Sequence, residues 1–335
     1  YYCNTCLQSY EASSEKLFCL YCKKVVPIIH GIPVFSNDIY WGKIAEPELK
    51  NIIDLIENHG FDAFSLQLQK KLDFTFDEDR ADWIFFIPPS NELVVLDIGA
   101  GLGRITIPLA KIAKHVIACD QSISRMRFLK KRAEAEQLNN VSVFVGDIFD
   151  LPIKENSIDL IVMNGVLEWV GQTKLYNNPR HAQIKSLEIC RKLLKKGGHI
   201  YIGIENRFAF VYARAFDHGG LRYTSFMPRP IANIYSQLRI NAPYRTYTYS
   251  KRSYETLLRE SGFTDRAKFY LEYPGYNLPR IIIPYDNIHI LQYAMTTFKR
   301  SQNIFVQMLL FLLRSLAVVR VYRFVFYSFG IIVKK

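Results

Sequence analysis

Four cysteines near the start of the chain have the spacing of metal ligands. Cys3, Cys6, Cys19 and Cys22 form a C-x2-C-x12-C-x2-C pattern. Each pair can supply two thiolate ligands from a tight turn, and the two pairs together complete one closed tetrahedral site. Because four thiolates leave no open coordination position, the pattern predicts a structural Zn²⁺ within a zinc ribbon over residues 1–36. Two disulfides or unmetallated thiols are the alternative interpretation.

Glycines at every second position follow an apolar run further along the chain. The segment reads Val95-Leu96-Asp97-Ile98-Gly99-Ala100-Gly101-Leu102-Gly103. Glycines let the backbone turn sharply and let a ligand approach where a β-carbon would collide. A dinucleotide fingerprint has its third glycine one position later, where this chain has Arg104, and it cradles a pyrophosphate. The observed spacing therefore favours a ligand without phosphate, whose amino-acid end packs against the loop.

Two acidic residues close the next two apolar runs. Asp120 lies about 20 residues after the start of the glycine loop, where a carboxylate can accept hydrogen bonds from two ribose hydroxyls. Asp147 is placed to accept a hydrogen bond from an adenine amino group, and Ile148 can cover the ring. The pattern predicts a nucleoside crevice at the ends of three strands. The alternative is that the glycines make only a tight turn and the acids cap helices.

The elements that would hold these residues alternate between strands and helices. Such alternation implies parallel pairing with right-handed crossovers, as in a Rossmann-like doubly wound α/β fold with a mostly parallel, seven-stranded sheet. The expected strands are 93–98, 115–119, 141–145, 158–163, 199–204, 267–273 and 280–283. The expected helices are 104–114, 123–138, 181–194 and 254–260.

The chain divides into four predicted regions. The zinc ribbon occupies residues 1–36, and residues 37–90 read as a helical linker. The α/β domain extends over residues 91–285 and is interrupted at 207–249 by an insertion rich in Arg, Tyr, Phe and Pro. We expect this insertion to form a lid or substrate loop. Residues 286–335 are predicted to form a helical amphipathic tail.

From residue 93 to 273 the chain resembles the class I S-adenosylmethionine-dependent methyltransferases. The resemblance includes Leu193-Leu194-Lys195-Lys196-Gly197-Gly198, the glycine turn that precedes the fifth strand in that family. It implies that S-adenosylmethionine is the cofactor and that Asn164 lies beside the reactive methyl group. By the same analogy Asp97, Gly99, Gly101 and Gly103 border the methionine part, Asp120 binds the ribose, and Asp147 and Ile148 bind the adenine.

A methyl group on a sulfonium is already activated, so the enzyme must mainly align the acceptor and exclude water. A general base is needed only when the acceptor is a hydroxyl or a protonated amine. Candidate bases are Glu168, Glu205, His181 and His218, each of which has a structural role as its alternative. Trp169 is a candidate wall of the acceptor pocket or a core residue.

The charge of the chain is concentrated at its carboxyl end. The net charge is +12, and residues 299–335 contain seven basic residues and no acidic ones. This uneven distribution argues against a broad nucleic-acid surface. Residues 303–335 suit a basic amphipathic helix in the headgroup region of a membrane, because arginines interrupt the apolar run. A helix packed on protein and a true membrane insertion are the alternatives.

The expected location is the cytoplasm or the inner face of the membrane. No secretory signal opens the chain, and six cysteines without such a signal indicate a reducing compartment.

Three functions compete for this sequence. Blocks such as Ile204-Glu205-Asn206-Arg207 and Pro274-Gly275-Tyr276-Asn277 resemble methyltransferases linked with bacterial surface polysaccharide synthesis. That resemblance implies a sugar or phosphate acceptor in a cell-envelope glycan or lipid-linked precursor. By their own chemistry, the arginines of the insertion can bind phosphate; they are Arg207, Arg222, Arg229 and Arg245.

RNA is the second acceptor, since the ribbon resembles small zinc-ribbon proteins that accompany RNA methyltransferases. The ribbon would then dock substrate, whereas otherwise it would buttress the domain. A non-catalytic scaffold is the third hypothesis, and the intact glycine loop with both acids argues against it.

Overall fold

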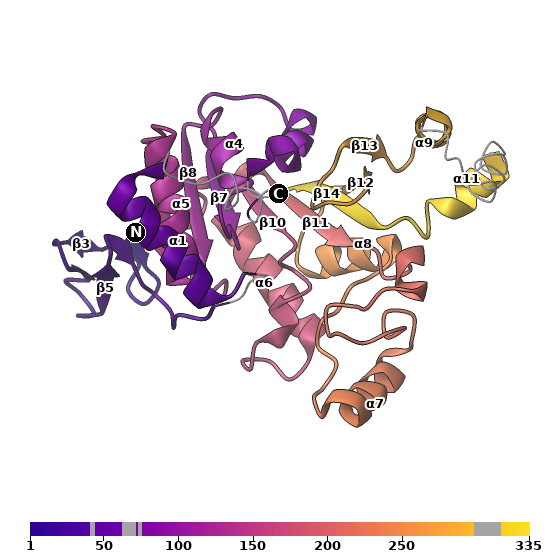
Figure 1. Ribbon diagram of the computed structural model, residues 1–335, viewed down its shortest axis with the longest axis horizontal. Helices are drawn as coiled ribbons and strands as arrows, with labels where there is room; N and C mark the ends of the chain where they lie inside the picture. Colours follow the sequence, from indigo (N-terminus) through magenta and orange to yellow (C-terminus); the bar gives the residue numbers. More distant parts are fainter. Residues whose placement is uncertain (41–43, 62–71, 73–75, 298–315) are drawn as a thin grey trace. The chain divides into compact units, whose positions relative to one another are not determined.

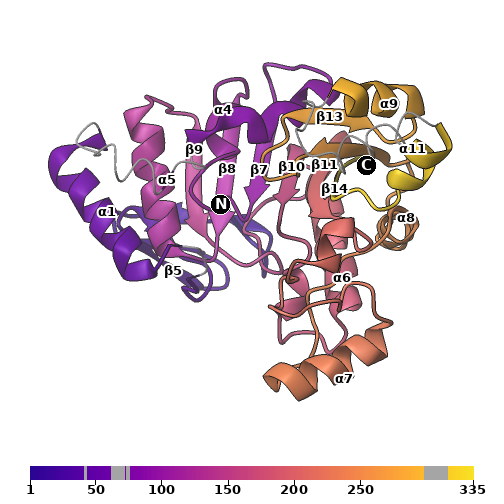
Figure 2. The ribbon, with the colours of Figure 1, turned by 45° about the vertical axis from the view of Figure 1, so that its right-hand side comes forward.

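The computed structural model describes residues 1–40, 44–61, 72, 76–297 and 316–335, which form two compact units. The first unit contains residues 1–163, 188–200 and 335, and the second contains residues 164–187 and 201–334. In the two ribbon views the first unit is drawn mainly in indigo to magenta and the second mainly in pink to yellow (Figures 1 and 2). Strand β11 (Leu194–Glu205) and helix α6 (Pro179–Leu193) each contribute residues to both units.

The first unit is built on strands in the order β11-β10-β7-β8-β9. Strands β7 (Val94–Ile98), β8 (His115–Asp120), β9 (Val141–Val145) and β10 (Ile158–Asn164) are β-branched runs with mostly buried side chains. Adjacent pairs among them are parallel. Helices α4 (Thr106–Ala110) and α5 (Ile123–Ala135) supply the crossovers. These elements confirm the predicted Rossmann-like α/β fold and bring the ends of β7, β8 and β9 to one edge.

The predicted ribbon is made of short strands in two small sheets, and the residues just after its last strand contact the edge of the large sheet. The short strands are β1 (Tyr2–Cys3), β2 (Gln8–Ser9), β3 (Glu11–Ala12), β4 (Lys16–Phe18), β5 (Val25–Ile29) and β6 (Ile32–Pro33). Just after β6, Val34 forms a parallel bridge with Val145, and the Phe35 amide donates to the Val145 carbonyl at 2.8 Å. The ribbon thus covers the edge strand β9, which would otherwise expose unpaired backbone groups.

The predicted helical linker is only partly helical. Helix α1 (Glu46–His59) buries Leu49, Ile52, Ile53 and Ile56, the residues whose spacing predicted it. The 3₁₀ segment η2 (Glu78–Phe86) follows, and residues 37–40 belong to no helix or strand. Most of the linker between α1 and η2 lies outside the described residues.

The second unit carries the strand order β13-β12-β14-β11. Strand β12 (Lys268–Tyr273) pairs antiparallel with both β13 (Ile281–Pro284) and β14 (Ser328–Lys334). Its helices are α7 (Arg229–Ile240), α8 (Lys251–Glu260), α9 (Ile288–Thr297) and α11 (Leu316–Tyr322), with the short 3₁₀ segments η3 (Val170–Gln172) and η4 (Phe210–Ala213).

The prediction of a wholly helical tail was wrong. Strand β14 occupies Ser328–Lys334, and its residues from Ser328 to Val333 are buried. A short β-branched run fills an internal strand position better than an exposed helix does. The described residues therefore contain eight strands from β7 to β14, where the sequence predicted seven.

Part of the tail lies outside this description. The apolar stretch 304–313, on which the membrane prediction depended, lies outside the described residues. Within the described ranges, no helix combines the length and apolar character needed to cross a bilayer.

Candidate functional site

The glycine loop begins where strand β7 ends. Gly99, Gly101 and Gly103 all have positive φ angles, of 71°, 57° and 84°, which L-residues adopt only with strain. A β-carbon at Gly103 would lie 2.2 Å from Cδ1 of Leu129 in α5, so a side chain there would force that leucine to move. A β-carbon at Gly101 would instead face open space, with no neighbour closer than 4.0 Å. The loop therefore presents bare backbone on the side where Gly101 lies.

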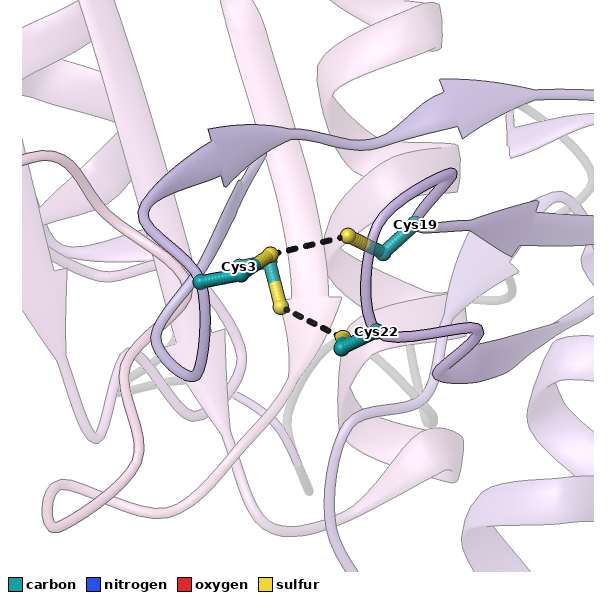
Figure 3. Close-up of side chains that lie close together, drawn as sticks. Cys3, Cys19 and Cys22 are labelled. Carbon is teal, nitrogen blue, oxygen red and sulfur yellow. Dashed lines mark hydrogen bonds between the residues drawn. The ribbon is translucent and has the colours of Figure 1, made fainter.

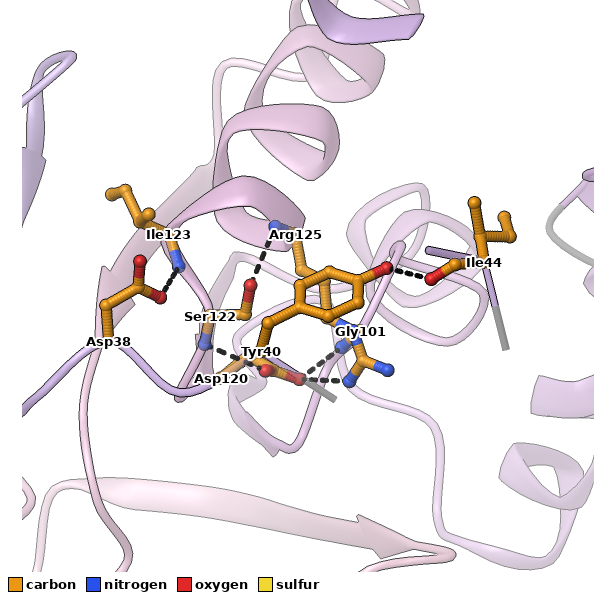
Figure 4. A network of polar contacts seen from close by, with 8 residues as sticks. All are labelled: Asp38, Tyr40, Ile44, Gly101, Asp120, Ser122, Ile123 and Arg125. Atoms are coloured by element: carbon orange, nitrogen blue, oxygen red, sulfur yellow. Dashed lines mark hydrogen bonds and ion pairs between the residues drawn. The ribbon is translucent and has the colours of Figure 1, made fainter. Parts of the chain in front are cut away.

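The Asp120 carboxylate folds back onto this loop from the end of β8. Its Oδ2 accepts a hydrogen bond from the Gly101 amide at 3.0 Å, and its Oδ1 accepts one from the Ser122 amide at 3.1 Å. Arg125 approaches Oδ2 at 3.2 Å, and its guanidinium lies 5.8 Å from the ring centroid of Tyr40. Figure 4 shows these side chains converging on the loop. Sequence reasoning missed Arg125 and Tyr40, although Arg125 lies only five residues after Asp120, in the first turn of α5.

Two further acids extend this edge. Asp97 is buried in β7, where its Oδ2 accepts a hydrogen bond from the Thr106 hydroxyl at 2.6 Å. Burial raises the pKa of Asp97 to about 6, an effect that Thr106 and the charge of Arg80 offset only in part. Asp147 follows β9 and accepts from the Gln121 amide at 2.7 Å and the Phe149 backbone at 2.9 Å. The structure therefore links the ends of three strands through short polar contacts.

Two predicted cofactor residues remain, Ile148 and Asn164. Ile148 is half-buried directly after Asp147. Asn164 is the last residue of β10 and belongs to the second unit. Its buried side chain lies so close to Gly203 of β11 that a β-carbon there would collide with its Oδ1. Gly203 is therefore needed to seat Asn164.

Three of the four candidate bases meet in the second unit. Nε2 of His218 lies 3.0 Å from Oε1 of Glu205 and 3.9 Å from Oε1 of Glu168. Both carboxylates are buried, and the three side chains offer atoms that all lie within 4.8 Å of one another. We call Glu168, Glu205 and His218 the acid–histidine cluster. Its geometry suits either a shared proton or one bound cation.

Neighbouring groups hold this cluster in place. The Tyr276 hydroxyl donates to Oε1 of Glu205 at 2.9 Å, and the half-buried Trp169 ring lies 5.0 Å from the His218 ring. Burial lowers the pKa of His218, but the hydrogen bond to Glu205 and the charges of Glu205, Glu168 and Asp217 outweigh it and raise that pKa to about 9. The fourth candidate, His181, does not join the cluster, because it is exposed on α6 against Tyr176.

The predicted phosphate ligands have other partners. Arg207 donates to the carbonyls of Ser225 and Met227, both at 2.6 Å. Arg229 donates to the Thr248 carbonyl and lies over the Tyr247 ring. Arg245 donates to four carbonyls between residues 171 and 177. These three arginines therefore also hold backbone carbonyls in and around the insertion, while Nη1 of Arg229 is buried without a hydrogen-bond partner among the described residues. Their binding of phosphate stays a prediction.

His218 also predicts a pH dependence of folding stability. Its folded pKa, about 9, exceeds the ordinary value of 6.5, so its contribution is fully present below pH 6.5 and is lost as pH rises through 9. The shift corresponds to on the order of 3 kcal/mol. Urea unfolding of wild type and His218→Gln should therefore differ most at pH 6 and converge near pH 9.5. A difference that stays constant over this range would contradict the ion pairing.

The four predicted ligand cysteines form one group. Their Sγ atoms lie within 4.8 Å of one another, with 3.4 Å between Cys3 and Cys22 and 3.1 Å between Cys6 and Cys19. All four are free thiols, which argues against the disulfide alternative. Figure 3 shows the thiols of Cys3, Cys19 and Cys22 pointing toward one another.

Each cysteine pair lies in a backbone turn of its own, and the two turns have the same form. The amide of Leu7 donates to the Cys3 carbonyl at 2.9 Å, and the amide of Lys23 donates to the Cys19 carbonyl at 3.0 Å. Leu7 and Lys23 both have positive φ angles, of 57° and 61°. Two matching knuckles that face each other are the arrangement that a tetrahedral thiolate site needs.

Comparisons with known proteins add to this geometry. Residues 89–217 match a family described as a methyltransferase domain. A phosphoethanolamine N-methyltransferase of Triticum aestivum is 35% identical over 126 residues, which cover 37% of this chain and 23% of that protein. Phosphoethanolamine N-methyltransferase 1 of Caenorhabditis elegans is 34% identical over 142 residues, covering 42% and 28%. The chain thus spans about a quarter of the length of these relatives.

Solved structures give weaker likenesses. A SAM-dependent methyltransferase from Aquifex aeolicus has a TM-score of 0.44 at 14% identity, over 87% of this chain and 99% of that one. Phosphoethanolamine N-methyltransferase 2 of Haemonchus contortus, in complex with phosphomonomethylethanolamine and S-adenosylhomocysteine, has a TM-score of 0.47 at 15% identity, over 87% and 60%. The assignment rests on the sequence matches: the chain carries a class I S-adenosylmethionine-dependent methyltransferase domain.

Proposed function

We propose that this protein transfers a methyl group from S-adenosylmethionine to a hydroxyl group of a cell-envelope glycan or its lipid-linked precursor. The observation that carries the proposal is the acid–histidine cluster, a buried proton-accepting group in the unit that contains the insertion. Methyl transfer to a hydroxyl or to a protonated amine needs such a base, whereas transfer to a neutral amine does not. The sugar is the choice favoured by the sequence blocks that resemble polysaccharide methyltransferases.

The cofactor-binding residues in this proposal are those of the glycine loop edge. Asp97, Gly99, Gly101 and Gly103 would border the methionine part, Asp120 the ribose, and Asp147 and Ile148 the adenine. Asn164, the last residue of β10, stays the residue predicted to lie beside the methyl group. The residues fit such a ligand, because Gly101 faces open space and Asp120 keeps acceptor capacity on Oδ1. When bound, the cofactor supplies an electrophilic methyl group on a positively charged sulfur.

The acid–histidine cluster would handle the proton of the acceptor. The bound cofactor would supply the methyl carbon and would keep the electron pair of its carbon–sulfur bond, so the residues of this chain would have only the acceptor proton to remove. Neutral His218 takes the hydroxyl proton, and Glu205 stabilises the imidazolium that results. Tyr276 orients Glu205, and Trp169 excludes water beside His218.

The cofactor assignment predicts the effect of a single substitution. Asp120→Ala should weaken S-adenosylmethionine binding by about 1–3 kcal/mol, because charge-assisted hydrogen bonds to the ribose are lost. Isothermal titration calorimetry measures this change, and Glu92→Ala, an exposed acid just before β7, serves as the control. No binding to folded wild type would remove the cofactor site, and unchanged affinity in Asp120→Ala would remove Asp120 from it.

The acceptor class can be tested by transfer of labelled methyl. We expect label in a lipid-linked glycan fraction, and not in phosphoethanolamine or in RNA. Label in phosphoethanolamine would instead assign the activity named for the sequence relatives. Label in RNA would revive the second hypothesis, which the ribbon supports poorly because residues 1–36 hold three lysines against two glutamates.

The ribbon would hold one structural Zn²⁺ through Cys3, Cys6, Cys19 and Cys22. Its donor set of four thiols and its short distances between sulfur atoms suit tetrahedral zinc, in which Zn–S bonds are about 2.3 Å. Contacts with β9 favour a buttressing role for the ribbon: the Tyr1 hydroxyl donates to the Val143 carbonyl, and the rings of Tyr1, Tyr10, Phe35 and Phe144 pack together.

A further inference from the structure

Helix α7 in the insertion has its apolar side chains on the wrong face for a helix of a folded domain. The two residues that it buries are Ala232 and Ser236, with 0% and 1% of their surfaces exposed. Its large aliphatic residues point outward: Ile231, Ile234, Leu238 and Ile240 are 54%, 60%, 80% and 47% exposed. Ile231, Ile234 and Leu238 share one face of the helix, whereas Ile240 lies on the opposite side. Helices normally bury a stripe such as these three residues form, so this face is built for a contact outside the domain.

The helix is nevertheless firmly seated. The Asn233 side chain accepts a hydrogen bond from the Tyr244 amide at 3.1 Å, and the Ser236 hydroxyl donates to the Ala242 carbonyl at 2.7 Å. Arg229 anchors its first turn through the Thr248 carbonyl. Both views show α7 away from the strands of its unit (Figures 1 and 2). The outward stripe is therefore the face of an ordered helix.

The charge around this stripe is positive. Residues 207–249 contain six arginines and a single acidic residue, Asp217. Asp217 is turned inward, where it accepts hydrogen bonds from the amides of Gly219 and Leu221, both at 2.9 Å. The three arginines without a structural role described above, Arg214, Arg222 and Arg239, are exposed. The outer surface of the insertion thus combines aliphatic side chains with positive charge only.

Exposed aromatic residues accompany this charge in the same segment. Phe216 and Tyr223 are 59% and 48% exposed, and Arg222 lies 4.6 Å from the centroid of the Phe216 ring. Aromatic and aliphatic side chains with arginines are the composition of a surface that enters the headgroup region of a bilayer. RNA would require base-stacking or phosphate contacts and would gain little from four exposed aliphatic side chains.

We infer that α7, together with Arg222 before it and Arg239 within it, docks the protein on an anionic lipid surface. Ile231, Ile234 and Leu238 follow helical spacing on one face and enter the acyl boundary, while Arg222 and Arg239 meet lipid phosphates. The inference deepens the proposed function, on which it rests for the identity of the acceptor, because a lipid-linked acceptor is presented at this surface. It differs from the predicted membrane contact through residues 303–335.

Vesicle flotation of the full chain tests the inference. Wild type should float with vesicles of phosphatidylcholine and phosphatidylglycerol, and much less with phosphatidylcholine alone. The double variant Ile234→Ser/Leu238→Ser should lower the partition coefficient at least about tenfold, since two well-exposed aliphatic side chains no longer leave water. The matched control is Leu20→Ser/Ile112→Ser, which removes aliphatic residues that are 51% and 50% exposed elsewhere, and it should float like wild type.

Electrostatic variants give a second, independent arm. Arg222→Gln/Arg239→Gln should remove much of the preference for phosphatidylglycerol and weaken the salt dependence of binding. Equal flotation of both double variants and wild type would overturn the inference, even if the protein binds vesicles through another segment. Failure of wild type to float would overturn it as well.

Other occupants of the stripe have distinct signatures. A wild type that is dimeric by light scattering, and monomeric only as Ile234→Ser/Leu238→Ser, would assign the stripe to a second copy of the chain and overturn the inference. Calorimetry with S-adenosylmethionine separates the two proposals. Flotation without cofactor binding would refute the enzyme assignment alone, and cofactor binding without flotation would refute the docking alone.

Discussion

His218→Gln is expected to lower kcat for methyl transfer about 10²- to 10⁴-fold, the usual contribution of a positioned general base. Glutamine keeps a polar side chain of similar reach but cannot take up a proton. S-adenosylmethionine affinity should stay within about twofold of wild type, because the proposed cofactor contacts come from other residues. Single-turnover assays with the labelled cofactor measure the chemical step. The matched control is His181→Gln, which changes an exposed histidine outside the acid–histidine cluster.

The pH profile distinguishes a base from a structural histidine. Neutral His218 is the active form, so kcat/KM should rise with pH up to about 9 and level off above it. Burial lowers this pKa, and Glu205, Glu168 and Asp217 raise it, with Tyr276 bound to Glu205. Glu205→Gln removes the largest favourable contribution and should move the inflection to lower pH. A purely structural role for Glu205 would leave the inflection where it was.

Two outcomes would refute this assignment. Full activity in His218→Gln, with a flat pH profile, would remove the general base. Loss of activity on chelation, with recovery on adding Mn²⁺ or Mg²⁺ but not Zn²⁺, would assign the acid–histidine cluster to a bound cation, which its geometry can also hold.

Cys19→Ser is expected to abolish zinc binding and to lower the melting temperature by on the order of 10 °C. Structural zinc in isolated fingers is worth about 10–16 kcal/mol of folding free energy, so a ribbon that lacks one thiolate unfolds. Unfolding the ribbon uncovers the edge of β9 and separates Phe35 and Tyr1 from Phe144. Losing these aromatic contacts costs the first unit about 3–5 kcal/mol.

Metal analysis and calorimetry together test this prediction. Wild type should carry one zinc per chain, and Cys19→Ser none. Cys119→Ala removes a cysteine from the core and should keep its zinc even though it also destabilises the sheet. Purified wild type without zinc, or Cys19→Ser with an unchanged melting temperature, would contradict a structural zinc site.

Local pattern determined much of this protein. The glycine loop, Asp120 and Asp147 were predictable because each follows an apolar run, and parallel strands bring their ends to one edge. The cysteine spacing likewise predicted a four-thiol group, since two short loops with matching turns can close on one point. In both cases the chemistry lies within a few residues of the element that positions it.

Long-range packing decided the rest. Glu168, Glu205 and His218 are candidates by residue type, but only the fold of the second unit brings them together and leaves His181 outside. The same holds for Arg207 and Arg245, whose guanidinium groups bind carbonyls that sequence cannot locate. Strand β14 depends on a gap beside β12 that exists only after the sheet forms. Contacts between residues far apart in the sequence depend on loop closure and core packing. The hydrophobic pattern of the sequence predicts single helices and strands but not these contacts.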